Sequence, residues 1–314
     1  MKLSIIVPVY NAEDSILKLI NTILSSKEIF ELICVDDGST DRSLEILKSI
    51  KDKRICVFTK QNEGVYKTWR YGLKKASGDY ITFFDSDDYI DTAYIQKIFE
   101  FINSVGADML LTPYSIIQGG GKRDQRLPFH DGIYEGDSLE MIRGKLLGGR
   151  IQYSKCTKVI KKTYYLDFVN HNMESDISDF EDWLTLISIF SKIKSMYVVN
   201  QCFYYYVQHE KSVTRSITSY DKNYRSLLKV IKCLGANGLA TEYLESIEFY
   251  GARSILYRCV GIKEFSLAKQ ILQSKRFYAY LIKADISSLE KIILYMRNAK
   301  LISVVFKIKK MIVG

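Results

Sequence analysis

The 314-residue chain lacks several features that mark particular classes of protein. It has only three prolines and no run rich in serine and glycine, so no flexible linker is expected. Its six cysteines form no Cys-x-x-Cys pair and most lie in apolar runs, which predicts reduced, buried thiols. No apolar run approaches about 18 residues, and polar side chains from Asn11 onward interrupt the N-terminal run too early for a signal peptide. We therefore expect a cytoplasmic protein without a transmembrane helix.

The chain has an excess of positive charge that no single region carries. Its composition, 47% hydrophobic and 26% charged, is that of a folded protein, and the formal net charge is +9. Such a charge suits a nucleic acid, a nucleotide diphosphate or an anionic membrane. The basic residues are scattered and no recognition-helix, RRM or zinc-finger pattern accompanies them, so we expect no nucleic-acid partner.

The first hundred residues alternate strand and helix patterns. Near-continuous apolar runs predict strands at residues 3–10, 30–37, 54–59 and 79–85. Between them, apolar residues recur at helical spacing, most clearly at 65–76, and Ser39, Thr40 and Asp41 are N-cap candidates for the second helix. This order predicts right-handed crossovers and a doubly wound, mostly parallel α/β sheet.

A polar cluster follows each of the four expected strands. The clusters are "PVYNAE", "DDGSTD", "KQNEG" and "DSDD". One such cluster alone is usually a solvated turn, in which a residue such as Gly38 supplies a positive φ. Ligands of doubly wound sheets bind beyond the carboxyl ends of the strands, so four clusters there predict a binding site.

The fourth cluster concentrates negative charge at the end of an apolar strand. Four acids, Asp85, Asp87, Asp88 and Asp91, fall within seven residues. Like charges this close cost stability unless a cation, positive side chains or solvent compensates them. The alternative is a capping turn before a helix at residues 91–101.

Five sequence pieces occur in the order typical of one enzyme family: "SIIVPVYNAE", "VDDGSTDRS", "QNEG", "ASGDYITFFDSDD" and "FEDW". Over residues 3 to about 215 the chain resembles the family 2 glycosyltransferases, among them bacterial surface-polysaccharide enzymes. The resemblance implies the GT-A fold, a Rossmann-like, mostly parallel central sheet with helices on both faces. It also implies a catalytic domain at 1–215, with a nucleotide-sugar-binding half at 1–100 and an acceptor half with the base at 101–215. A helical region follows at 216–314.

The resemblance also implies an activity. It is the inverting, metal-dependent transfer of a sugar from a nucleotide-diphosphate sugar, expected to be a UDP-sugar, to a saccharide acceptor. In relatives that build surface glycans the acceptor is often linked to a polyprenyl lipid. Two other functions stay open: a nucleotidyltransferase, and a non-catalytic scaffold that binds a nucleotide or a membrane. A nucleotidyltransferase would need a glycine-rich, basic loop after the first strand, where this chain has the acidic "PVYNAED".

The family motifs assign roles to residues of this chain. Asp85 and Asp87 are the acids of its D-x-D motif, and Mn²⁺ or Mg²⁺ would be held by Asp87 and Asp88, with His209 as a further candidate. A hard cation bridging both phosphates stabilises the leaving group, and a strand period of two would place Asp85 on the same face as Asp87. The resemblance places the nucleotide-sugar against Pro8, Tyr10, Asn11, Glu13, Asp37, Asn62, Arg70, Asp85 and Ser86.

One motif departs from the family pattern. Many relatives carry an Arg-Asn pair on the helix after the "QNEG" turn, where this chain has Trp69 and Arg70. Either Arg70 or Lys67 could then reach the diphosphate.

The segment "SDFEDW" contains the candidates for a catalytic base. Glu181 and Asp182 stand in the first turn of an expected helix with Asp179 as its N-cap candidate, and acids there favour the helix dipole without any catalytic role. The resemblance instead implies a base, for which we choose Asp182 with Glu181 as its neighbour. It also matches Lys158 to a family lysine.

The last hundred residues carry no catalytic motif. Near the end, apolar residues such as Leu301 and Ile308 fall on one helix face and lysines such as Lys307 on another. This pattern fits either peripheral binding to an anionic membrane, at the inner face of the cell membrane, or packing on the catalytic domain.

Overall fold

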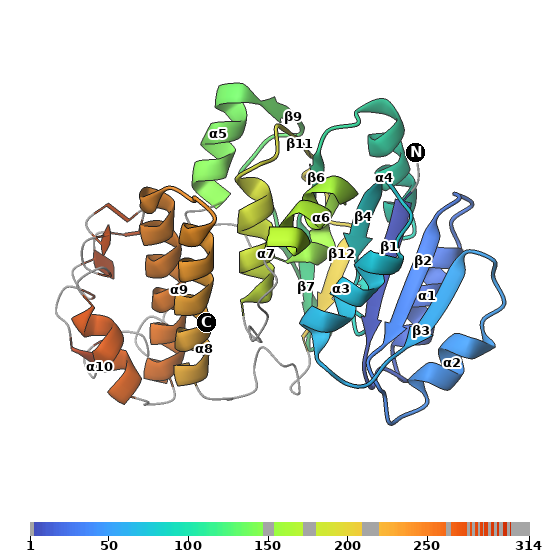
Figure 1. The fold of residues 1–314 in the computed structure, drawn as a ribbon, viewed down its shortest axis with the longest axis horizontal. Coiled ribbons are helices and arrows are strands. Elements are labelled where there is room, and N and C mark those ends of the chain that lie inside the picture. Colours follow the sequence, from blue (N-terminus) through green and yellow to red (C-terminus); the bar gives the residue numbers. More distant parts are fainter. Residues whose placement is uncertain are drawn as a thin grey trace. The chain divides into compact units, whose positions relative to one another are not determined.

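The computed structural model describes residues 3–146, 154–171, 180–208, 220–261 and 265–274, with individual positions between 277 and 302 (Figure 1). Its contacts divide the chain into two compact units. Unit 1 comprises Met1–Met141, Tyr153–Ser178 and Ile189–Arg215, and unit 2 comprises Ile142–Gln152, Asp179–Ser188 and Ser216–Gly314. None of the helices described is both long and apolar enough to cross a membrane.

The strands of the described segments all lie in unit 1. They are β1 (Leu3–Val9), β2 (Glu31–Asp36), β3 (Ile55–Thr59), β4 (Tyr80–Phe83), β5 (Tyr89–Ile90), β6 (Met109–Leu111), β7 (Tyr114–Gln118), β8 (Gly121–Gln125), β9 (Gly132–Glu135), β10 (Lys158–Lys161), β11 (Ser195–Val198) and β12 (Tyr204–Val207).

The described helices are α1 (Ile16–Leu24), α2 (Ser43–Ser49), α3 (Val65–Lys75), α4 (Tyr94–Ser104), α5 (Gly136–Lys145), α6 (Lys162–His171), α7 (Glu181–Phe190), α8 (Tyr220–Ala236), α9 (Thr241–Gly261) and α10 (Phe265–Gln273), with a 3₁₀ turn at Lys155–Thr157.

Eight of the described strands form one sheet, in the order β3-β2-β1-β4-β10-β6-β11-β9. The first four strands pair in parallel, as their apolar runs predict. β10 then enters antiparallel between β4 and β6, while β11 lies parallel to β6. The carboxyl ends of β1 to β4 therefore lie along one edge, where the four polar clusters meet.

Helices cover both faces of this sheet. The core on one face joins α1 and α4 to strand residues such as Leu3, Ile5 and Val7. On the other face α3 lies so close that a Cβ on Gly72 would be 2.6 Å from Cγ2 of Ile6. The expected doubly wound arrangement is confirmed.

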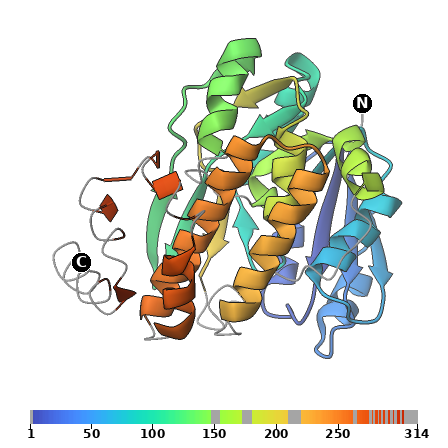
Figure 2. The same cartoon turned by 60° about the vertical axis from the view of Figure 1, so that its left-hand side comes forward.

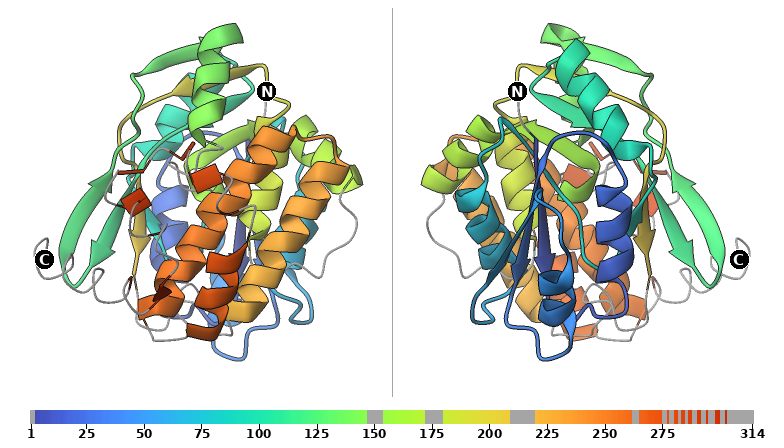
Figure 3. Two further views of the ribbon diagram at one scale, coloured as in Figure 1. Left: turned by 90° about the vertical axis from the view of Figure 1, so that its left-hand side faces the viewer. Right: turned by 90° about the vertical axis from the view of Figure 1, so that its right-hand side faces the viewer.

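A second, four-stranded sheet in the described part of unit 1 has the order β5-β12-β7-β8. β7 and β8 form its hairpin (Figure 3), and β12 pairs with β7 on one side and β5 on the other. Since β5 begins at Tyr89, directly after Asp88, this sheet fixes the far end of the "DSDD" cluster.

The regular secondary structure described in unit 2 is all helical. α8 and α9 run side by side (Figure 2), and a Cβ on Gly251 would lie 2.6 Å from Cδ1 of Leu227. Arg253 of α9 donates to Glu290 at 2.6 Å. The expected C-terminal helices are therefore present, although residues 303–314, which carry most of the amphipathic pattern, lie outside the described residues.

Candidate functional site

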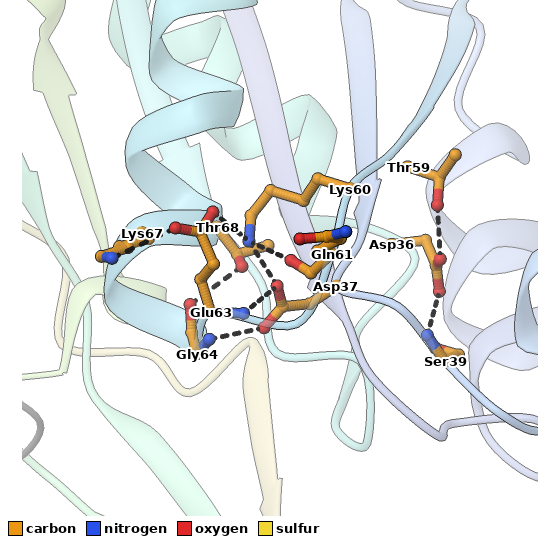
Figure 4. Close-up of polar contacts among 10 residues, drawn as sticks. All are labelled: Asp36, Asp37, Ser39, Thr59, Lys60, Gln61, Glu63, Gly64, Lys67 and Thr68. Atoms are coloured by element: carbon orange, nitrogen blue, oxygen red, sulfur yellow. Dashed lines mark hydrogen bonds and ion pairs between the residues drawn. The ribbon is translucent and has the colours of Figure 1, made fainter.

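The loop after β3 is attached to the end of β2 by a buried ion pair. The Lys60 ammonium lies 2.5 Å from Oδ1 of Asp37, and the two side chains are 11% and 5% exposed. Oδ1 of Asp37 also accepts the Glu63 N–H at 3.0 Å, and Oδ2 accepts the Gly64 N–H at 2.9 Å (Figure 4). A single carboxylate thus organises the "KQNEG" loop.

The environment of Asp37 keeps it ionised. Burial raises the pKa of this carboxyl, but hydrogen bonds from Lys60, from the Glu63 N–H and from Thr68, with the charge of Lys60, together hold the pKa below its ordinary value. Asp37 is therefore a fixed negative charge at the expected nucleotide edge, already satisfied by protein donors.

Two glycines make this arrangement sterically feasible. Gly38 has φ +70°, and a Cβ there would lie 2.9 Å from the Asn62 backbone nitrogen. Gly64, the N-cap of α3, has φ +88°. Side-chain-bearing residues rarely adopt these conformations, so the turns after β2 and β3 depend on glycine.

The loops after β1 and β2 hold each other through reciprocal hydrogen bonds. Asn11, at φ +48°, accepts the Thr40 N–H on its Oδ1 at 2.8 Å, and its own N–H donates to the Ser39 hydroxyl at 3.1 Å. Glu13 accepts the Arg42 N–H at 3.0 Å. Asn11 and Glu13 were expected to contact the nucleotide-sugar. In the structure their side chains hold the loop after β1 to the loop after β2.

None of the three N-cap candidates is the N-cap residue of the second helix. α2 begins at Ser43, after an N-cap residue Arg42 that makes no side-chain cap bond. Asp41 instead accepts the Glu13 N–H at 3.0 Å with one oxygen and the Ser43 N–H at 2.9 Å with the other. One donor to Asp41 is therefore a backbone N–H of the neighbouring loop, which sequence spacing does not reveal.

The "DSDD" cluster forms a turn rather than the end of a strand. β4 ends at Phe83, and the Asp88 N–H donates to the carbonyl of Asp85 at 3.2 Å. We expected strand alternation to put Asp85 and Asp87 on one face. That expectation is wrong, because neither residue lies in the strand. Both residues are nevertheless exposed in the turn.

Asp88 has the opposite environment from its neighbours. It is 3% exposed, accepts the Tyr204 hydroxyl at 2.5 Å and accepts the Val207 N–H at 2.7 Å. Burial, followed by the charge of Asp85, raises the pKa of Asp88 to about 8. Both of its oxygens are occupied by β12, so the described geometry gives Asp88 the role of an anchor for the turn.

The turn can supply carboxylates to a cation. Among the residues described, no group of three or more His, Cys, Asp or Glu side chains converges as a metal site. Mg²⁺ and similar hard ions need only one or two protein carboxylates when phosphates and waters complete the shell. The exposed pair Asp85 and Asp87 fits that requirement, with Ser86 between them.

The helix that departs from the family pattern uses Trp69 for packing. Trp69 is fully buried and packs edge-on against Phe83, with ring centroids 5.6 Å apart. Arg70 donates to the Tyr66 hydroxyl at 3.0 Å, while Lys67 donates to Glu63 at 3.1 Å. Trp69 therefore serves the core of unit 1.

The expected catalytic acids begin α7, in unit 2. Glu181 and Asp182 form its first turn, and both are partly exposed. Phe180, directly before them, has φ +64°, a strained conformation for a bulky residue. The surrounding fold must enforce this turn, as is common at functional positions. Asp179 and His209 lie outside the described residues.

The remaining family match is a buried lysine. Lys158 is fully buried and donates to the Ser154 carbonyl at 2.6 Å, and burial lowers the pKa of its ammonium to about 7. This hydrogen bond holds the 3₁₀ turn that leads into β10.

Three further expected nucleotide-sugar contacts, Pro8, Tyr10 and Asn62, lie along the edge formed by the ends of β1 and β3. Tyr10 is 50% exposed.

Two residues of this region were missed by the sequence reasoning. Lys60 belongs to the "KQNEG" cluster without a role of its own, and Tyr204 is one of three consecutive tyrosines that match no motif. Their partners lie 23 and 116 residues away, so only the fold reveals the contacts.

Comparison with known proteins agrees with this architecture. The family model described as glycosyl transferase family 2 matches residues 4–165. An uncharacterized glycosyltransferase of Haemophilus influenzae is 48% identical over 107 residues, 32% of this chain and 42% of that protein. The poly(ribitol-phosphate) beta-N-acetylglucosaminyltransferase TarS of Staphylococcus aureus is 29% identical over 212 residues, 66% of this chain and 35% of TarS. The chain thus covers less than half the length of either relative.

Solved structures give the same result for the fold. S. aureus TarS in complex with UDP-GlcNAc superposes with a TM-score of 0.71 at 20% identity, over 99% of this chain and 92% of the TarS fragment. This likeness confirms the GT-A architecture. Because the family model covers more than half of the chain, the protein belongs to glycosyl transferase family 2.

Proposed function

We propose that this protein is an inverting glycosyltransferase that moves a hexosyl group from a UDP-sugar to an acceptor hydroxyl, with Mn²⁺ or Mg²⁺ at the Asp85–Asp88 turn. The observation that carries the proposal is the split among these acids. Asp85 and Asp87 are exposed, whereas Asp88 is buried and bonded to β12. The fold therefore exposes two carboxylates of one turn at the sheet edge, where ligands bind in doubly wound folds.

Each acid has a separate task in this proposal. Asp87 is the cation ligand and Asp85 either shares the cation or accepts hydrogen bonds from the ribose hydroxyls. A bound cation would neutralise charge that develops on the departing diphosphate. Asp88 is left out of the ligand set, because both of its oxygens already accept protein hydrogen bonds.

The remaining chemistry is assigned to Asp182. Inversion needs a base on the face of the sugar opposite the leaving group, and one carboxylate can both orient the acceptor hydroxyl and take its proton. Asp182 is partly exposed at the start of α7, after the strained Phe180. Glu181 is its neighbour in the same turn.

The acceptor is proposed to be a saccharide or a related hydroxyl-bearing chain. The names of two relatives include poly(ribitol-phosphate), in TarS and in the poly(ribitol-phosphate) beta-glucosyltransferase of Bacillus spizizenii. A polyprenyl-linked acceptor rests on the resemblance to enzymes that build surface glycans, and contact with an anionic membrane rests on the sequence pattern near the C-terminus. If the membrane contact is right, flotation with anionic liposomes should weaken when residues 299–314 are deleted.

A donor screen tests the proposal without knowing the acceptor. The protein is incubated with UDP-, GDP-, CDP- and TDP-sugars, with Mn²⁺ or with EDTA, and released nucleoside diphosphate is measured. Glycosyl transfer to water should release UDP from at least one UDP-sugar, and only with Mn²⁺. Release that is equal in EDTA would refute the metal requirement, and release from another nucleotide sugar alone would refute the choice of UDP.

A further inference from the structure

The hydroxyl group of Tyr204 joins the two ends of the Asp85–Asp88 turn. It accepts the Asp85 N–H at 3.2 Å and donates to Oδ2 of Asp88 at 2.5 Å. No other described side chain is bonded to both ends. One hydroxyl on β12 thus closes the turn from the inside.

Other contacts fix the turn between these ends. The Ser15 hydroxyl donates to the Ser86 carbonyl at 2.8 Å, and the Cys156 thiol donates to Oδ2 of Asp85 at 3.3 Å. These contacts reach the turn from the α1 N-cap and from the 3₁₀ turn before β10. Together they leave the outward direction to the exposed side chain of Asp87.

We propose that Tyr204 is a positioning residue that holds Asp85 and Asp87 ready for a cation and a nucleotide diphosphate, with Cys156 orienting the Asp85 carboxylate. Two nearby carboxylates repel each other, so an unrestrained turn would splay them and would have to be ordered at each binding event. A turn fixed by internal donors removes that cost, as outer hydrogen bonds do around metal ligands. The identity of the ligand in this inference rests on the proposed function.

Tyr204 can be changed without removing its packing. Its ring is 2% exposed and lies 5.9 Å from the ring of Phe84, measured between centroids. Tyr204→Phe keeps the ring and removes only the hydroxyl. The matched control is Tyr94→Phe, because Tyr94 also packs on Phe84, at 5.8 Å, but its hydroxyl contacts Thr112.

The first readout is the Mn²⁺ concentration that gives half-maximal UDP binding. Tyr204→Phe should raise it about tenfold or more, the usual effect of losing an outer partner of a metal site. Tyr94→Phe should leave it within about twofold, even if both variants lose similar thermal stability. Cys156→Ala should raise it too, by less than Tyr204→Phe. An unchanged value in Tyr204→Phe would overturn the inference.

The second readout needs no ligand. Amide hydrogen exchange at Asp88 reports the bond from its N–H to the Asp85 carbonyl, which Tyr204 does not itself make. Exchange there should accelerate in Tyr204→Phe and stay at the wild-type rate in Tyr94→Phe. If the wild type shows no metal-dependent UDP binding, the proposed function fails by itself. The exchange data then decide whether Tyr204 holds the turn, and an unaltered rate would overturn that claim.

Discussion

The Lys60 ammonium is buried against the Asp37 carboxylate at 2.5 Å, and this pair joins the ends of two parallel strands. Asp37 follows β2 and Lys60 follows β3, so the contact fixes the two loops that flank the expected nucleotide position. Breaking a buried pair by removing one partner leaves an uncompensated charge, which is more costly than replacing both.

The pair should therefore behave non-additively in a double-mutant cycle. Asp37→Asn and Lys60→Met are each expected to lower the free energy of unfolding by about 3 kcal/mol. The double variant should lose less than the sum, by about 1 to 3 kcal/mol. Urea unfolding can be followed through Trp69, which is fully buried in unit 1, in a Trp183→Phe background. Strict additivity would mean that the two side chains do not stabilise each other.

The same carboxyl predicts a pH dependence. Because the pKa of Asp37 is lower in the folded protein than its ordinary value of 3.8, its contribution to stability is complete above that value. It is lost as the pH falls through the lowered folded pKa. The stability difference between wild type and Asp37→Asn should thus be constant from pH 8 to pH 5 and shrink below about pH 4. A difference that varies between pH 5 and pH 8 would assign the effect to another group.

A substitution at Asp182 should affect sugar transfer without affecting binding of the nucleotide. Asp182→Asn should bind UDP like the wild type and lower the rate of sugar transfer about a hundredfold or more, because an amide cannot take the acceptor proton. Glu181→Gln, in the same helix turn, is the matched control and should have a much smaller effect on the rate. Single-turnover kinetics with a UDP-sugar identified by the donor screen measure this step. Equal losses in both variants would argue against Asp182 as the base.

Much of the fold could be predicted from local patterns. The apolar runs at β1 to β4 and the periodic helices between them are local signals, and the sheet orders them as a doubly wound fold requires. The position of "DSDD" at the sheet edge followed from the same pattern. The helical C-terminal region was also foreseen, and α8 to α10 confirm it over the described residues.

The directions of individual side chains could not be predicted in this way. Asp85, Asp87 and Asp88 have the same chemistry, yet only Asp88 is buried, because β12 supplies the two donors that it needs. Trp69 departs from the expected family motif, and its burial against Phe83 depends on the packing of α3 on the sheet. Such outcomes depend on partners distant in the sequence, which motif spacing does not encode.

We propose that the exposed carboxylates of the Asp85–Asp88 turn bind a metal–nucleotide pair. We would titrate UDP calorimetrically into the wild type, with Mn²⁺ and then with EDTA, and repeat the pair of titrations on Asp87→Asn. Glu45→Gln is the control for loss of one exposed negative charge, because Glu45 lies on α2 with a side chain 71% exposed. We expect Mn²⁺-dependent UDP binding that is lost in Asp87→Asn and kept in Glu45→Gln. Binding of UDP that is equally strong in EDTA, or unchanged in Asp87→Asn, would contradict it.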